Sequence, residues 1–168
     1  NTGKQDMISV IAGKYKGRKL HGLKNLHVRP TQAKIRKSIF QILEPFDGLK
    51  VLDLYAGVGT LGFEALSRGA NQIVFVEKDL HVYKILEKNS ALFNHANIKM
   101  YLCDAIQYIS RIREEKFDII FADPPYSMIN FQLLKEKVQN CLKPDGIFCM
   151  EMKKQSIMEP HIRIKYYG

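Results

Sequence analysis

The feature that most constrains the fold is a regular alternation of short apolar segments and helical segments from residue 49 onward. The apolar segments have the length and composition of buried strands: Lys50–Tyr55, Gln72–Val76, Ile98–Cys103, Phe117–Ala122, Ile147–Met152 and, more weakly, Ile162–Tyr166. Helical patterns lie between them: Gly59–Arg68, Asp79–Phe93, Ala105–Ile112 and Asn130–Leu142, the last followed by a turn at Lys143–Gly146. Repeated β-α units of this kind predict an α/β fold, a doubly wound and mostly parallel sheet with helices on both faces.

Polar groups stand where the predicted strands end. The first strand ends with Asp53-Leu54-Tyr55 and leads into a glycine loop, the second ends in Glu77, the third in Asp104-Ala105, and the fourth in Asp123. Each acid alone is equally typical of a helix cap. Because ligands of such sheets bind outside the carboxyl ends of the strands, four polar ends together indicate a binding site there.

The loop after the first strand carries Gly57, Gly59 and Gly62, the spacing of a glycine-rich nucleotide-binding turn. Glu77, twenty residues after Gly57, suits the two hydroxyls of a ribose, and Asp104 suits an adenine amine. A carboxylate just before the glycines would repel a pyrophosphate but suits a cation. Asp53 therefore favours S-adenosylmethionine over a dinucleotide, with Asp53, Ala56, Gly57, Gly59, Glu77, Asp104 and Ala105 as the cofactor-binding residues.

The segment Asp123-Pro124-Pro125-Tyr126 is the candidate catalytic motif. A carboxylate and nearby carbonyl oxygens can accept hydrogen bonds from an exocyclic amine. Two prolines restrict the loop, and a tyrosine ring offers a base a stacking surface. The motif predicts a clamp for the amino group of a base, although the same residues also form a plain turn after a strand.

The positive charge of the chain is concentrated near its start. The net charge is +9, yet residues 1–50 hold 11 Lys or Arg against 3 Asp or Glu, while residues 51–168 hold 15 against 14. A segregated basic region favours binding to a phosphate backbone. The predicted RNA-binding residues are Lys14, Lys16, Arg18, Arg29, Thr31, Lys34 and Arg36.

Two elements are expected in this basic region, a glycine-bounded hairpin within Ile8–Leu26 and a helix after Arg29-Pro30-Thr31 that ends before Pro45. Thr31 is the expected cap of the helix. Its docking face would hold Ile35, Ile39, Ile42 and Leu43, with Lys34, Arg36, Lys37 and Gln41 on the opposite, basic side.

Composition excludes several classes. No apolar run is long enough for a membrane helix, and the polar start lacks the apolar stretch of a signal peptide. Three cysteines without C-x-x-C spacing and five scattered histidines predict neither disulfides nor a metal site. Because unpaired cysteines are typical of a reducing compartment, we expect a cytoplasmic location. The expected organisation is a tag-like or disordered start at 1–6, a basic extension at 7–48, and a cofactor-binding core at 49–168; we expect a monomer.

The segments Val10–Arg18, Arg29–Thr31, Asp53–Ala70 and Asp123–Tyr126 resemble the bacterial 16S rRNA guanine-N2 methyltransferases, a family with the class I, S-adenosylmethionine-dependent fold. The resemblance covers nearly all of 7–168, and the basic start together with the Glu64–Ala70 run makes it specific. It implies that Gly57, Gly59, Glu77 and Asp104 contact the cofactor and that Asp123 to Tyr126 hold a guanine. The implied partner is rRNA, free or within an assembled or assembling small subunit.

The chain departs from the family pattern at Val58, where Ser or Thr is usual, and at Lys37, where an acid is usual. The family also continues past Gly168 into a final antiparallel strand. Three other functions stay open from the residues: an adenine-N6 or other amine methyltransferase on DNA or RNA, a nicotinamide-dependent oxidoreductase, and a non-catalytic RNA-binding protein on the same scaffold.

Overall fold

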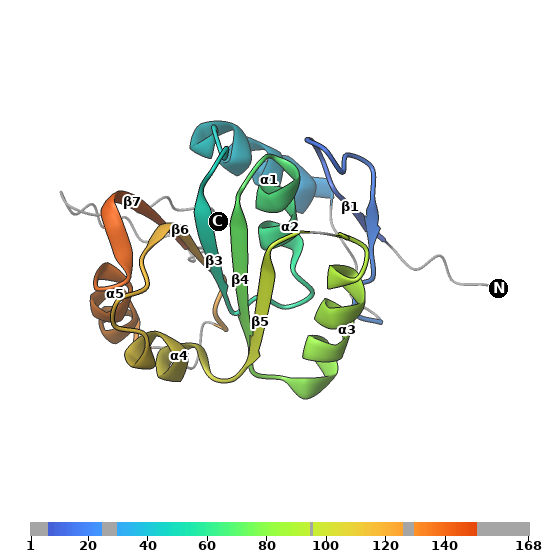
Figure 1. Ribbon diagram of the computed structural model, residues 1–168. Helices are drawn as coiled ribbons and strands as arrows, with labels where there is room; N and C mark the ends of the chain where they lie inside the picture. Colours follow the sequence, from blue (N-terminus) through green and yellow to red (C-terminus); the bar gives the residue numbers. More distant parts are fainter. Residues whose placement is uncertain (1–6, 25–29, 95, 126–129, 151–168) are drawn as a thin grey trace.

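A computed structural model describes residues 7–24, 30–94, 96–125 and 130–150, with only the backbone at Pro30 and Thr31. The elements in chain order are β1 (Ile8–Ser9), β2 (Lys19–Leu20), α1 (Pro30–Leu43), β3 (Lys50–Leu54), α2 (Thr60–Ser67), β4 (Gln72–Glu77), α3 (Leu80–Ser90), β5 (Ile98–Leu102), α4 (Ala105–Arg111), β6 (Phe117–Ala122), α5 (Phe131–Gln139) and β7 (Leu142–Met150) (Figure 1). The predicted α/β fold is confirmed: β5, β4, β3, β6 and β7 form one parallel sheet in that order. The sixth strand expected at Ile162–Tyr166 lies outside the described residues.

Alternate residues of the strands face two separate hydrophobic layers. Val51 on β3 and Ile73 on β4 point into a layer covered by β1, β2, α1, α2 and α3, whereas Leu52 and Val74 point into a layer covered by α4 and α5. Figure 1 shows these two groups of helices on opposite faces of the sheet. Successive side chains of a strand point to opposite faces of the sheet. Because helices cover both faces, consecutive apolar residues of β3 and β4 are all buried.

The strand order reverses beside β3. From β3 the chain steps outward to β4 and β5, then returns to place β6 against the other side of β3. Leu54 and Ala122 are paired in register, so the loops that follow β3 and β6 leave the sheet side by side. A crevice forms where two such loops diverge, and this is where open parallel sheets bind ligands.

The segment predicted as a turn at Lys143–Gly146 lies instead within β7. Leu142 pairs with Phe117 and Ile147 pairs with Ile119, so the intervening residues form an irregularity in the strand. Asp145 takes a left-handed backbone conformation there, with φ of 64°. These residues interrupt the regular pairing, but β7 pairs with β6 again from Ile147 onward, as at a β-bulge.

The docking face of α1 differs from the predicted one. The helix begins at Pro30, which places the expected cap Thr31 inside the first turn. Ile39, Phe40 and Leu43 are buried, while Ile35 and Ile42 are 37% and 55% exposed. Phe40 reaches Phe46 and Phe121, with ring centroids 5.2 Å and 5.5 Å away, and this aromatic contact fixes the rotation of the helix.

The β1–β2 ribbon is attached to α2 by the run of residues that made the family resemblance specific. The Glu64 carboxylate accepts hydrogen bonds from Ile11 N and Ala12 N at 2.8 Å and 3.2 Å. Ser67 Oγ donates to Ala12 O at 2.6 Å and accepts from Tyr15 N at 3.0 Å. A side chain at Gly13, where φ is +90°, would put Cβ 1.9 Å from Ser67 O. The basic extension is therefore a packed part of the molecule over its described residues.

No helix within the described ranges has the length and apolar character needed to cross a membrane.

Candidate active site

The loop after β3 brings backbone close to the crevice. Gly57 and Gly59 have φ of +60° and +95°, and no other group lies within 4 Å of a Cβ built at Gly57. By contrast, a Cβ at Gly62 would stand 2.2 Å from the Phe75 ring. The glycines thus serve different needs: Gly57 leaves open space beside the loop, and Gly62 lets α2 pack on the sheet.

Glu77, at the end of β4, holds this loop from the side. Its Oε1 accepts a hydrogen bond from Gly57 N at 3.0 Å, and its Oε2 accepts one from Asp79 N at 2.8 Å. A carboxylate has about four acceptor positions, so these two bonds leave capacity for ligand hydroxyls. The predicted acid therefore lies beside the glycine loop, where a ribose would need it.

Asp53 is buried beneath the same loop, with 2% of its surface exposed. Its Oδ2 accepts a hydrogen bond from Gly62 N at 3.1 Å. Burial raises the pKa of the Asp53 carboxyl well above its ordinary value; the bond from Gly62 lowers the pKa, and the charges of Asp123 and Glu77 raise it. A cationic ligand group would reverse this shift, because it favours the ionised carboxylate.

Asp123, directly after β6, lies where two cavities meet. The loop cavity, of about 280 Å³, is bounded by Asp53, the glycine loop and Asp123. The helix cavity, of about 230 Å³, lies between α1 and the ends of β6 and β7, where Phe121 and Cys149 line it. The two cavities share Ile8, Gln32, Thr60, Leu61 and Asp123.

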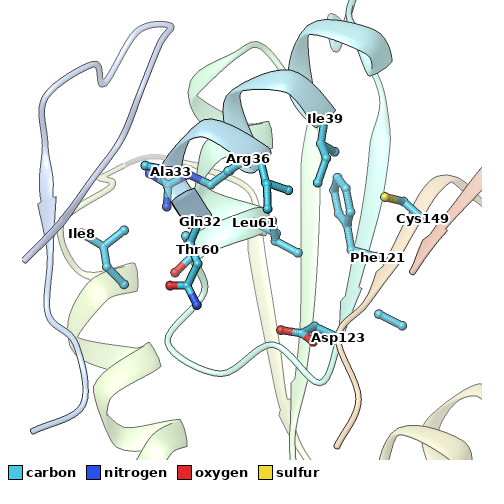
Figure 2. A pocket seen from close by; sticks show the side chains of 12 residues that line it. Ile8, Gln32, Ala33, Arg36, Ile39, Thr60, Leu61, Phe121, Asp123 and Cys149 are labelled. Carbon is cyan, nitrogen blue, oxygen red and sulfur yellow. The ribbon is translucent and has the colours of Figure 1, made fainter. Parts of the chain in front are cut away.

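Figure 2 shows the helix cavity, with the side chains of α1 above and Asp123 below at the end of β6. Asp123 itself is exposed, Pro124 is buried and Pro125 is exposed. Tyr126 lies outside the described residues. The arrangement puts one carboxylate on the boundary of both cavities.

Asp104 serves as the N-cap of α4, the alternative that the sequence left open for each acid. Its Oδ1 accepts a hydrogen bond from Gln107 N at 3.0 Å, and Ala105 behind it is buried. Neither residue lines the two cavities described above. Tyr55, which lines the loop cavity, has a raised pKa, chiefly because of burial, and the charge of Asp104 adds to the rise.

The predicted RNA-binding residues fall into two groups. Lys14, Lys16 and Lys34 are exposed. Arg18 is also exposed, but its guanidinium lies 4.8 Å from the Tyr15 ring centroid and donates a hydrogen bond to Leu92 O, just after α3. The side chains of Arg29 and Thr31 are outside the described set.

Arg36 was expected on the solvent-facing side of α1, and this is wrong. Its side chain is 11% exposed, its Nε lies 3.8 Å from Glu64 Oε1, and its Nη2 donates to Ser9 O at 2.8 Å. Burial lowers the pKa of Arg36, while the charge of Glu64 raises it. The guanidinium joins α1, α2 and the ribbon, and it lines the helix cavity from inside the fold.

Several lining residues had no signal in the sequence. Gln32, Thr60 and Leu61 line both cavities, and Gly22 and Leu23 of the extension line the loop cavity. Ordinary polar and apolar residues of this kind become site residues only through the packing of distant segments.

Within the described residues, no cluster of three His, Cys, Asp or Glu side chains could hold a metal ion.

A parallel sheet with this order, a glycine loop after β3 and acids at the strand ends define the class I methyltransferase fold. The chain belongs to the family described as "Conserved hypothetical protein 95", which matches residues 8–165. It is 34% identical to "Ribosomal RNA small subunit methyltransferase D" of Buchnera aphidicola, over 94% of this chain and 84% of that protein. The same-named Escherichia coli protein is 34% identical, over 83% of this chain and 68% of that one. Among solved structures, "Putative methyltransferase yhhF from Escherichia coli" superposes with a TM-score of 0.74 at 30% identity, over 82% of this chain and 76% of that chain.

Proposed function

We propose that this protein transfers the methyl group of S-adenosylmethionine to the exocyclic N2 amine of a guanine in small-subunit rRNA. The observation that carries the proposal is the place of Asp123, on the boundary between the loop cavity and the helix cavity. A transferase needs donor and acceptor in adjoining spaces with a shared positioning group between them. The relatives named above for ribosomal RNA support the choice of substrate.

The residues of the loop cavity fit the proposed cofactor. S-adenosylmethionine would supply a methyl group on a positively charged sulfur, together with a cationic amino group. The buried Asp53 carboxyl suits that amino group, because a cation beside it offsets the cost of burying the charge. Within the cavity, Gly57 offers open backbone. Beside it, Glu77 offers acceptors for ribose hydroxyls, and Asp104, which does not line the cavity, is the proposed acceptor for the adenine amine.

The acceptor side depends on Asp123 and its neighbours. The lone pair of the guanine amine is delocalised into the ring, so the amine is a weak nucleophile. The Asp123 carboxylate and the Pro124 carbonyl would accept hydrogen bonds from the two N–H groups and hold the nitrogen in line with the methyl group. The carbon–sulfur bond of the donor would break as the new C–N bond forms, and one N–H proton would leave to solvent afterwards, so Asp123 need not be a strong base. We assign Tyr126 the role of stacking on the base once it is turned out of its neighbours.

The basic extension would hold the rRNA backbone, with Lys14, Lys16, Arg18 and Lys34 as exposed contacts and Arg29 as a further candidate from the sequence. We propose rRNA within an assembled or assembling subunit as the partner, a cytoplasmic location and a monomeric enzyme. A basic surface draws any nucleic acid, so the particular base is selected by the helix cavity.

The test is methyl transfer from labelled S-adenosylmethionine to free 16S rRNA and to assembled small subunits, followed by nucleoside analysis. We expect labelled N2-methylguanosine from the rRNA. Labelled N6-methyladenosine would reject the choice of base. An absence of label in both substrates, with the protein folded, would reject the activity itself.

A further inference from the structure

The loop cavity is lined partly by the N-terminal extension, whose positive charge indicates RNA binding. Ile8, Gly22 and Leu23 precede α1, yet all three line the loop cavity together with Asp53 and the glycine loop. Gly22 and Leu23 are both half-buried. The stretch Leu20–Leu23, here called the wall segment, therefore brings two lining residues, Gly22 and Leu23, to the cavity that Asp53 also lines.

Asn89, near the end of α3, fixes the wall segment in place. It is fully buried, and its Oδ1 accepts a hydrogen bond from His21 N at 2.7 Å. Its Nδ2 donates to His21 O and to Val58 O, both at 2.9 Å. One amide thus satisfies both backbone groups of His21 and holds a carbonyl of the glycine loop.

The Asn89 contacts join two distant segments that line one cavity. His21 stands next to the lining residues Gly22 and Leu23, and Val58 is itself a lining residue. Because the three bonds are made inside the protein, an apolar replacement would leave three backbone groups without their partner. The wall segment and the glycine loop would then no longer be held together through Asn89.

We propose that the wall segment is part of the S-adenosylmethionine site, with Leu23 in contact with the cofactor and Asn89 as the residue that positions it. The proposal rests on the proposed function in taking S-adenosylmethionine as the ligand. It also means that the extension serves both ligands: Lys14 and Lys16 lie on the same ribbon that leads into the wall segment. Any shift of the ribbon by RNA would change cofactor affinity, and cofactor binding would change RNA affinity by the same factor.

The experiment is isothermal titration calorimetry of S-adenosylmethionine into the full chain without RNA, comparing wild type, Leu23→Ala and Asn89→Ala. We expect Kd to rise by about tenfold in both variants, through lost contact in the first and lost positioning in the second. Omitting RNA removes any effect that acts through substrate binding. A purely structural role of Asn89 would lower the melting temperature and leave the Kd of the folded protein unchanged.

Two control variants match these changes elsewhere. Val138→Ala removes buried volume from the layer under α5, on the opposite face of the sheet, and Leu133→Ala trims an exposed leucine on the same helix. Both should keep Kd within about twofold of wild type. Wild-type affinity in Leu23→Ala would overturn the inference, whether or not Asn89→Ala folds. If the wild-type chain itself failed to bind S-adenosylmethionine, the proposed function would fail first and the inference with it.

Discussion

The carboxyl edge of the sheet and the N-terminal extension carry opposite charges, yet they divide those charges in the same way. At the edge, Asp53 is buried and bonded to Gly62 N, whereas Asp123 is exposed at the meeting of two cavities. In the extension, the Arg36 side chain is half-buried beside Glu64, with 11% of its surface exposed, whereas Lys14 is exposed. Charge alone indicates which ligand each region attracts; burial decides which charged groups hold the fold and which can meet a ligand.

The largest effect is expected at the exposed acid of the edge. Asp123→Ala should lower methyl transfer by roughly a thousandfold or more, since the amine loses its positioning acceptor. S-adenosylmethionine should still bind, because Asp53 and the glycine loop remain. Single-turnover transfer and calorimetric titration measure the two quantities separately.

Glu136→Gln, on the exposed face of α5, is the matched removal of a charge and should leave transfer unchanged. Full activity in Asp123→Ala would end the clamp hypothesis.

The next effect concerns the buried charges that attach the extension. Glu64 is 1% exposed and faces Arg68, whose Nε lies 3.0 Å away, as well as Arg36 and two backbone N–H groups. Glu64→Ala leaves these partners uncompensated and should cost about 3–5 kcal/mol in the free energy of unfolding. Urea unfolding of this variant, beside Glu136→Ala as the control, measures the difference. A loss no larger than the control's would show that the extension is held by apolar packing alone.

A smaller effect separates stability from binding at Asp53. Since the folded protein raises the pKa of this carboxyl, its stabilising contribution is present at low pH and is lost as the pH rises through that raised pKa. Asp53→Asn should therefore increase the free energy of unfolding at neutral pH by roughly 1 kcal/mol. The same variant should bind S-adenosylmethionine about tenfold more weakly, because the cationic amino group loses its counter-charge.

Titrations across pH sharpen this prediction. In wild type, cofactor affinity should fall as the pH is lowered through the raised pKa of Asp53, and the variant should lose that dependence. Equal pH dependence in both proteins would place the responsible group elsewhere.

The smallest effect is expected at the exposed lysines of the extension. Replacing Lys14 and Lys16 together by Ala should weaken rRNA binding modestly and reduce the slope of log K against log salt by about one to two. Both side chains are exposed, so cofactor affinity and stability should hold. Filter binding at several salt concentrations measures the slope. An unchanged slope would move the RNA contact away from the ribbon.

The periodicity and spacing of the sequence were sufficient to predict the α/β fold. Alternating apolar runs predicted the strands, and the acids and glycines that follow them were correctly placed at one edge because parallel strands all end on the same side. These features are local, and a chain of this pattern has few other ways to bury its apolar runs.

Only tertiary packing decided the rest. Ile35 and Ile42 satisfy a helical stripe as well as Phe40 does, and the contact of Phe40 with Phe121 selected the rotation of α1. That rotation turned Arg36 inward, and the same folding brought Leu23 beside the glycine loop. The sequence by itself determined the succession of strands and helices along the chain and the polar residues at the strand ends, because these follow from local periodicity. Which charges are buried, and which distant segments share a cavity, depend on contacts between residues far apart in the chain, where many pairings have nearly equal local preference.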